Sequence, residues 1–502
     1  MTTPARTPST TTSPVTGTAP RSTTTHLALH PDRALPTDPQ QRAAAREIYA
    51  ATRALPIISM HGHVEAEAFV DNQPFADPAQ LLVVPDHYVT RMLVSQGASP
   101  ESLGIPRVDG GPVETDSREI FRRFCAGWHL YRGTPSRYWL EHELVEVFGV
   151  DQVPSATTAD AIYDTISAQI AEPDFRPRQL LDRFDIELIA TTDPATSTLE
   201  HHTRLAAEGL GGRVIPTFRP DAVVHLDRPA WRADVVELGR VAGIDTGDYA
   251  GYLAALRERR QAFVAAGALA SDHGHLSADT TPLPDSVAAD LYARALHGTT
   301  GDGAASAVTD AEVHAFAAHM LFQMASMAAE DGLVMQIHPG VLRDHNDAVL
   351  AAHGQDKGFD IPVAAEYTRA LRPLLQAFGT HPGFRAILFT VDETVYSREL
   401  APLAGAYPSL RLGAPWWFLD SPEGMRRFRE SATETAGFWN TSGFVDDTRA
   451  YVSIPARHDL SRRVDAGFLA RLVTEHRLGL DEAVETAVDL AHTLPRLSYA
   501  RR

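Results

Sequence analysis

The feature of this sequence that most limits its fold is a series of eight short apolar segments, each followed directly by polar residues. Uninterrupted apolar runs of this length suit strands that are buried on both faces, as in a parallel sheet. Helix-like segments fill most of the intervals, for example residues 310–331 and 420–437. Eight strands that alternate with helices predict an α/β fold, a (β/α)8 barrel of the TIM type. The candidate strands are residues 55–60, 186–190, 213–216, 267–270, 332–337, 385–389, 410–412 and 442–445.

The interval between the first and second candidate strands breaks this alternation. It spans residues 64–185, which is far longer than a single crossover helix requires. It contains the aromatic-rich stretch 131–148 (YRGTPSRYWLEHELVEVF). We therefore expect a mostly helical insertion, residues 64–185, that covers one side of the barrel mouth.

The start of the chain differs in composition from the rest. Residues 1–25 consist mainly of Thr, Pro and Ser, with few apolar side chains to bury. Such a segment does not offset the entropy that it would lose on ordering, so we expect a disordered tail. The predicted domain organisation is this tail followed by one barrel over residues 26–502.

The charge balance excludes one class of partner and constrains another. The chain has 64 acidic and 45 basic residues, which gives a formal net charge of −19 at pH 7. A nucleic-acid-binding protein needs a basic face, and the sequence has no basic run. An anionic substrate would be repelled at long range, so local arginines must reverse the field.

Cysteine and hydropathy indicate the compartment. The chain has a single cysteine, Cys125, which allows no intramolecular disulfide and is interpreted as a buried small apolar residue. No apolar run approaches the roughly 20 residues of a membrane span. The N-terminal residues also lack the apolar stretch of a secretory signal. We expect a cytoplasmic protein without a membrane segment.

A metal site is predicted where candidate strands end. His61 and His63 are two residues apart after the first strand, so both imidazoles can point the same way. His338 ends the fifth strand and Asp447 ends the eighth. Nitrogen ligands with one carboxylate suit Zn2+, the expected ion, and also Mn2+, Co2+ or Fe2+. The alternative is that His338 is a structural barrel histidine and Asp447 a helix cap.

The sixth candidate strand bears on the number of metal ions. It ends in Phe389-Thr390-Val391-Asp392 and carries no histidine. A two-metal hydrolase of this barrel type generally has a further histidine there, together with a bridging carboxylate or carboxylated lysine. The sequence therefore predicts one divalent metal ion.

Eight short motifs resemble those of the uronate isomerase family of the amidohydrolase superfamily. They occur in that family's order and spacing, and the similarity covers roughly residues 35–500. The motifs are residues 58–63 (ISMHGH), 86–92 (DHYVTRM), 191–193 (TTD), 216–221 (PTFRPD), 271–274 (SDHG), 335–340 (MQIHPG), 416–418 (WWF) and 446–449 (DDTR).

The resemblance implies an enzyme that interconverts D-glucuronate with D-fructuronate and D-galacturonate with D-tagaturonate. It assigns the metal site to His61, His63, His338 and Asp447, with His338 either a ligand or a partner of the ligands. The family's other active-site positions match Tyr88, Arg219, Trp417 and Arg449. Three departures, at Thr448, Pro339 and residues 453–458, concern neighbours of these residues and leave substrate preference open.

The chemistry of an aldose–ketose isomerase suggests a role for each residue. A proton must move between C2 and C1, which requires a base, an oxyanion-stabilising group and a proton donor. Asp447 could be the base, Tyr88 the donor or relay, and Arg449 the group that holds the negative oxygen. Arg219 could grip the substrate carboxylate with its planar fork. Trp416, Trp417 and His338 could contact the sugar.

Each role has a structural alternative. Tyr88, Trp416 and Trp417 could belong to the core, Arg449 could be an ion-pair partner of Asp447, and Arg219 could brace a loop. The motif Asp272-His273 has no assigned role. Two other functions compete: a mononuclear metal-dependent hydrolase or lactonase on the same barrel, and a metal-bearing binding protein without turnover. We expect a homo-oligomer that acts on a small hexuronate.

Overall fold

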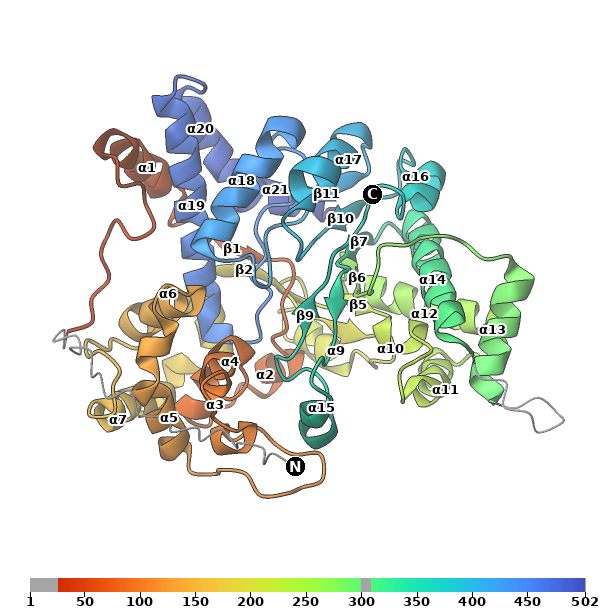
Figure 1. Cartoon of the computed structure of the whole chain (residues 1–502), viewed down its shortest axis with the longest axis horizontal. Helices are drawn as coiled ribbons and strands as arrows, with labels where there is room; N and C mark the ends of the chain where they lie inside the picture. Colours follow the sequence, from red (N-terminus) through yellow and green to blue (C-terminus); the bar gives the residue numbers. More distant parts are fainter. Residues whose placement is uncertain (1–25, 299–307, 502) are drawn as a thin grey trace, which may run out of the picture.

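The computed structural model describes residues 26–298 and 308–501 of the chain. The expected disordered tail, residues 1–25, lies outside the described residues. The fold is mixed α/β with parallel sheets, and Figure 1 shows the strands in the middle of the molecule with helices around them. None of the helices in the described ranges combines the length and apolar character that crossing a bilayer requires.

The parallel strands form a three-stranded sheet in the order β1-β2-β4 and a six-stranded sheet in the order β11-β10-β7-β6-β5-β3. Residues 186–194 form β2 in the first sheet and β3 in the second. Residues 214–219 likewise form β4 in the first sheet and β5 in the second, so the chain passes directly from one sheet to the other. An antiparallel pair, β8 (Val341–Leu342) and β9 (Ile361–Pro362), stands apart. The parallel strands are β1 (Ile57–Ser59), β2 (Ile186–Ala190), β3 (Asp193–Pro194), β4 (Val214–Ile215), β5 (Phe218–Arg219), β6 (Ala270–His273), β7 (Val334–Ile337), β10 (Ala386–Leu388) and β11 (Leu410–Leu412).

Two candidate strands differ from the structure: the fourth, expected at residues 267–270, is formed by Ala270–His273 (β6), and the eighth does not form. Residues 442–445 form no regular strand, and only Thr441 bridges to Leu412, in parallel. Gly443 has φ of +79°, which breaks the extended pairing. The segment still contacts the residues after β1, because the Asp447 amide donates to the His61 carbonyl at 3.1 Å and the His63 amide to the Thr448 carbonyl at 2.9 Å.

Seven α-helices lie between β1 and β2 in the sequence and gather at one end of the molecule, below β1 in Figure 1. Their apolar faces share a buried cluster that includes Phe121, Phe124, Tyr131 and Leu144. These helices are α2 (Ala66–Asp71), α3 (Pro78–Leu82), α4 (His87–Val94), α5 (Ser117–Ala126), α6 (Pro135–His142), α7 (Ala159–Ala171) and α8 (Pro177–Arg183).

The remaining helices include most of those predicted between strands. The predicted helix 310–331 is α14, whose N-terminus has a capping box of Thr309 and Glu312 and whose C-terminus is followed by Gly332 at φ +75°. The others are α1 (Pro39–Thr52), α9 (Glu200–Ala207), α10 (Asp221–Val224), α11 (Trp231–Ala242), α12 (Tyr249–Ala265), α13 (Asp285–His297), α14 (Asp310–Asp331), α15 (Asp347–His353), α16 (Arg372–Phe378), α17 (Ala401–Ala406), α18 (Pro422–Ala436), α19 (Ile454–Thr474), α20 (Leu480–Val488) and α21 (Leu494–Ser498).

Candidate active site

A cavity of about 630 Å³ opens where the parallel strands end. Such an edge is where parallel α/β folds place their ligands, because the loops after successive strands meet there. All but one of the candidate site residues line it, and His61 lies beneath its surface with 2% of its area exposed. The lining residues include His63, Tyr88, Arg219, His338, Trp416, Trp417, Asp447 and Arg449.

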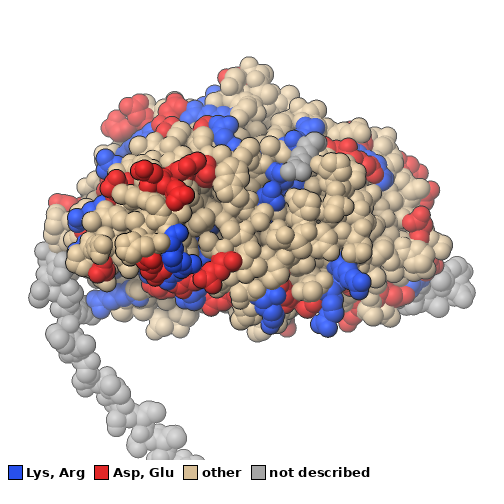
Figure 2. Space-filling view, turned by 90° about the horizontal axis from the view of Figure 1, so that it is seen from above, with Lys and Arg blue, Asp and Glu red and all other residues tan. Residues whose placement is uncertain are grey.

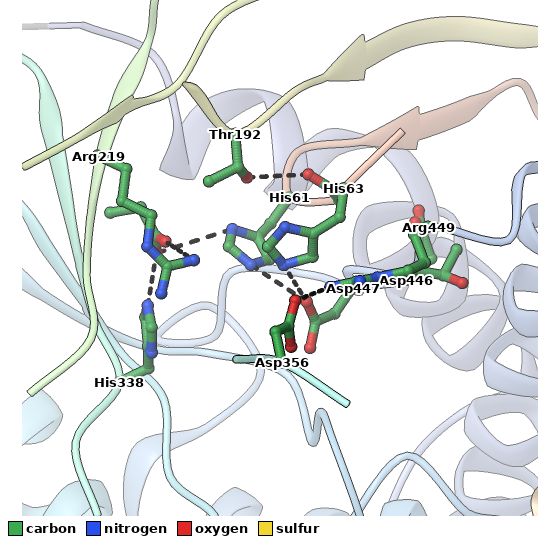
Figure 3. A network of polar contacts seen from close by, with 12 residues as sticks. His61, His63, Thr192, Arg219, His338, Asp356, Asp446, Asp447 and Arg449 are labelled. Atoms are coloured by element: carbon green, nitrogen blue, oxygen red, sulfur yellow. Dashed lines mark hydrogen bonds and ion pairs between the residues drawn. The ribbon is translucent and has the colours of Figure 1, made fainter. Parts of the chain in front are cut away.

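Two histidines converge on one carboxylate at this cavity. The Nε2 atoms of His61 and His63 lie 3.3 and 3.1 Å from the same Asp447 oxygen, Oδ1. Figure 3 shows the two rings side by side with Asp447 beneath them. The backbone of Asp447 has φ of +43°, in the left-handed region that costs free energy for a non-glycine residue.

The electrostatics of this group fit a bound cation. Burial by itself would raise the pKa of Asp447, but His61 and His63 hold it far below its ordinary value. Burial lowers the pKa of His63, whereas at His61 the carboxylates of Asp272 and Asp447 outweigh burial and raise the pKa. Both ring nitrogens of His61 are buried without a hydrogen bond. A metal ion would satisfy these groups in place of a shared proton.

His61, His63 and Asp447 form the metal-ligand group: their possible ligand atoms all lie within 4.8 Å of one another. His338 is not in it: its Nε2 atom lies 2.9 Å from Asp272, and its ring centroid is 6.2 Å from that of His61. Among the described residues, the structure therefore brings three of the four predicted metal ligands together and sets His338 beside them.

Arg219, at the end of β5, is held by two carboxylates rather than free. Its Nε atom donates to Asp221 at 2.9 Å, and its Nη1 atom lies 3.3 Å from Asp272. Arg219 therefore braces the loop after β5, as the structural alternative expected. Its guanidinium also lines the cavity, and 22% of the side chain is exposed. Arg219 thus brings guanidinium N–H donors to the cavity, while Asp221 and Asp272 balance its positive charge.

Tyr88, on α4, is buried in the cavity wall, and its hydroxyl is already hydrogen-bonded there. Its hydroxyl donates to Asp420 at 3.2 Å and accepts a hydrogen bond from the Phe418 amide at 2.9 Å. Burial and the neighbouring Asp420 raise the pKa of the phenol well above its ordinary value. Tyr88 therefore keeps its proton, which is directed at Asp420.

Arg449 does not pair with Asp447. Its Nη2 atom forms an ion pair with Asp356, which belongs to the loop between α15 and β9. Burial by itself would raise the pKa of Asp356, but Arg449 lowers it to about 2. This pair draws the 341–362 segment toward the metal-ligand group (Figure 3).

The two tryptophans after β11 lie differently. Trp416 is 4% exposed and packs edge-on against His338, at 4.8 Å between ring centroids. Trp417 stacks on Phe418 at 5.1 Å, and the Arg343 guanidinium lies over its ring at 5.3 Å. Trp416 is therefore mainly a core residue, while Trp417 is a wall of the cavity.

Sequence reasoning missed three acidic residues that hold this site together: Asp272, Asp356 and Asp420. Asp272 stood within a recognised motif, so its place at a strand end was a usable signal. The other two lie on loops far along the chain, where no spacing marks them.

A mixed α/β enzyme with a His/His/Asp group suited to a metal ion is the class that this fold and site define. The chain also resembles proteins of known identity. A uronate isomerase of Rhizobium meliloti is 53% identical over 471 residues, which cover 94% of this chain and 99% of that protein. The crystal structure of glucuronate isomerase from Caulobacter crescentus superposes with a TM-score of 0.91 at 50% identity, covering 94% of this chain and 97% of the other. That of uronate isomerase from Thermotoga maritima gives 0.86 at 28% identity, covering 95% and 100%.

The family model for glucuronate isomerase matches residues 40–494. The chain therefore belongs to the glucuronate isomerase family. The resemblance indicated by the eight motifs is confirmed, and so is the prediction of an isomerase.

Proposed function

We propose that this chain interconverts D-glucuronate with D-fructuronate, and D-galacturonate with D-tagaturonate, by metal-assisted proton transfer between C2 and C1. The observation that carries the proposal is the convergence of His61 and His63 on one oxygen of Asp447 at a cavity that arginines also line. That arrangement offers a base, a cation site and guanidinium hydrogen-bond donors for an anionic sugar within one cavity.

One divalent ion, Zn2+ by preference, would be held by His61, His63 and Asp447. When bound, it would supply a Lewis acid that stabilises negative charge on a substrate oxygen. His338 supports this centre through Asp272 rather than as a ligand.

The side chains around this centre divide the remaining work. Asp447, kept ionised by its neighbours, accepts the proton from the substrate. Arg449 stabilises the developing oxyanion once the substrate competes with Asp356 for it, and Arg219 attracts the carboxylate. Tyr88 donates only if Asp420 takes part in the relay, since its hydroxyl already points there. Trp417 offers a face to the sugar.

The fold proposal is a closed (β/α)8 barrel over residues 26–502, with residues 64–185 as a helical cover on one side of its mouth. The amide-to-carbonyl hydrogen bonds that join segment 441–448 to β11 on one side and to His61 and His63 on the other support closure. Tail 1–25, self-association into a homo-oligomer and a cytoplasmic location stay predictions from the sequence. On the face that Figure 2 shows, acidic and basic patches alternate.

The proposed activity is tested by offering the metal-replete protein glucuronate, galacturonate and a panel of sugar lactones. We expect ketose formation from both uronates and none of the ring opening that a hydrolase would cause. Coupled reduction of the ketose product measures the rate. Lactone opening with both uronates untouched would replace the isomerase by the metal-dependent hydrolase.

The fate of the C2 hydrogen tests the proposed mechanism. If Asp447 removes that hydrogen as a proton, exchange with solvent competes with its return to C1. In D2O we therefore expect partial deuterium incorporation at C1 of the ketose, measured by NMR and mass spectrometry. Complete retention of the substrate hydrogen over many turnovers would instead indicate a hydride shift between the carbons.

A further inference from the structure

Asp272 lies directly behind the wall of the active-site cavity. It is the third residue of β6, and its side chain is fully buried. Its neighbours Ser271 and His273 hydrogen-bond to each other at 2.9 Å on one face of the strand, so Asp272 points to the other face. Its carboxylate is not part of the cavity lining but contacts two residues that are, Arg219 and His338.

The His61 ring lies between two carboxylates. Its Nε2 atom faces Asp447 at 3.3 Å, and its Nδ1 atom faces Asp272 Oδ1 at 3.8 Å. A histidine that ligates a metal through one nitrogen usually offers the N–H of its other nitrogen to a carboxylate, which fixes the tautomer and the ring direction. Shortening the second contact by about 0.8 Å would make it a hydrogen bond. Asp272 is the only carboxylate that the structure sets beside Nδ1 within ion-pair distance, among the residues described.

The same carboxylate contacts two side chains of the cavity wall. Oδ1 lies 2.9 Å from Nε2 of His338, and Oδ2 lies 3.3 Å from Nη1 of Arg219. The space beside them is closed: a Cβ at Gly274 would stand 2.9 Å from His338 and 3.0 Å from Arg219. Asp272 therefore contacts His61 after β1, Arg219 in β5 and His338 after β7. These side chains are closely packed.

We propose that Asp272 is a positioning residue of the reaction. Its carboxylate keeps the proton of His61 on Nδ1, so that Nε2 is free for the metal ion, and it holds the Arg219 guanidinium toward the substrate carboxylate. The inference rests on the proposed function, since it names the residue that prepares that site.

The test compares wild type with Asp272→Asn, which keeps the shape and removes the charge. Metal-free protein is titrated with Zn2+ against a chromophoric chelator. We expect about one ion per wild-type chain, and binding about 10- to 100-fold weaker in Asp272→Asn, the usual effect of losing a carboxylate behind a metal-ligating histidine. The KM for glucuronate should also rise, because Arg219 is less well held.

Asp331→Asn is the matched control. Asp331 ends α14, accepts hydrogen bonds from the buried Arg260 at 2.6 and 3.0 Å and does not line the cavity. It should lose stability but bind Zn2+ within about twofold of wild type, as expected for a site that touches no ligand. If Asp272→Asn does not fold, Asp272→Glu serves instead: it keeps the charge, yet its longer arm cannot meet both His61 and His338, so Zn2+ affinity should still fall.

Two outcomes separate this inference from the proposed function. Unchanged Zn2+ affinity and KM in a folded Asp272 variant would overturn the positioning role while leaving the isomerase intact. Wild type that binds Zn2+ but converts no uronate would overturn the function, and the affinity comparison would still decide whether Asp272 positions His61.

Discussion

Asp447→Asn is expected to lower kcat for glucuronate by at least about 10³-fold, with little change in KM. Asparagine keeps the size of the side chain but cannot accept a proton, and loss of a general base typically costs about 10² to 10⁴ in rate. The same oxygen faces two histidines, so metal occupancy should fall as well. Turnover is therefore measured at saturating Zn2+ with the bound metal determined in each sample.

Asp392→Asn is the control for this variant. Asp392 follows β10 at the same edge of the sheet but is not a cavity residue. It should retain more than about half of the wild-type kcat, because its side chain binds its own loop, at the Thr394 amide and hydroxyl, rather than the cavity. A fully metal-loaded Asp447→Asn variant with kcat within tenfold of wild type would show that another group is the base.

The sequence predicts well those strands, helices and site residues whose positions depend on patterns among neighbouring residues. A strand buried along its whole length, such as β10, needs continuous apolar residues, so its position follows from the sequence to within a residue. Helix α14 carries its own start and stop signals and was predicted with both ends correct. The His61/His63 pair is visible because strand geometry alone makes alternate residues share a face.

Contacts between distant loops are the part that could not be predicted. Asp356 and Asp420 meet Arg449 and Tyr88 across separations of 93 and 332 residues, and no local period records such pairings. The eighth candidate strand failed for a related reason. Its apolar residues are buried as predicted, but the backbone around Gly443 is set by packing against Pro495, which a local pattern does not contain.

Arg457→Met is expected to lower the midpoint of thermal unfolding by roughly 5 °C, because it leaves a buried carboxylate without its cation, a change that costs about 3 to 5 kcal/mol. Arg457, on α19, is 1% exposed and donates to Asp420 at 3.0 Å and to the Asp446 carbonyl at 3.3 Å. Its guanidinium also lies 3.7 Å above the Trp139 ring. Methionine fills much of the volume, so the loss reports the charge. Calorimetry at a fixed scan rate measures it.

The pH dependence of that loss identifies its cause. Burial raises the pKa of Asp420 from 3.8 to about 6, against the opposing effect of Arg457. Between these values the folded chain binds more protons than the unfolded chain, so this carboxyl's contribution to stability falls as pH rises. Without Arg457 the folded pKa moves higher, at about 1.4 kcal/mol per unit, and the fall extends to higher pH. The deficit of Arg457→Met should therefore be larger at pH 8 than at pH 5.5. Adding Asp420→Asn to Arg457→Met should recover part of the lost stability at pH 8, because no unpaired buried charge then remains. An equal loss of stability at both pH values would instead assign it to the missing packing on Trp139.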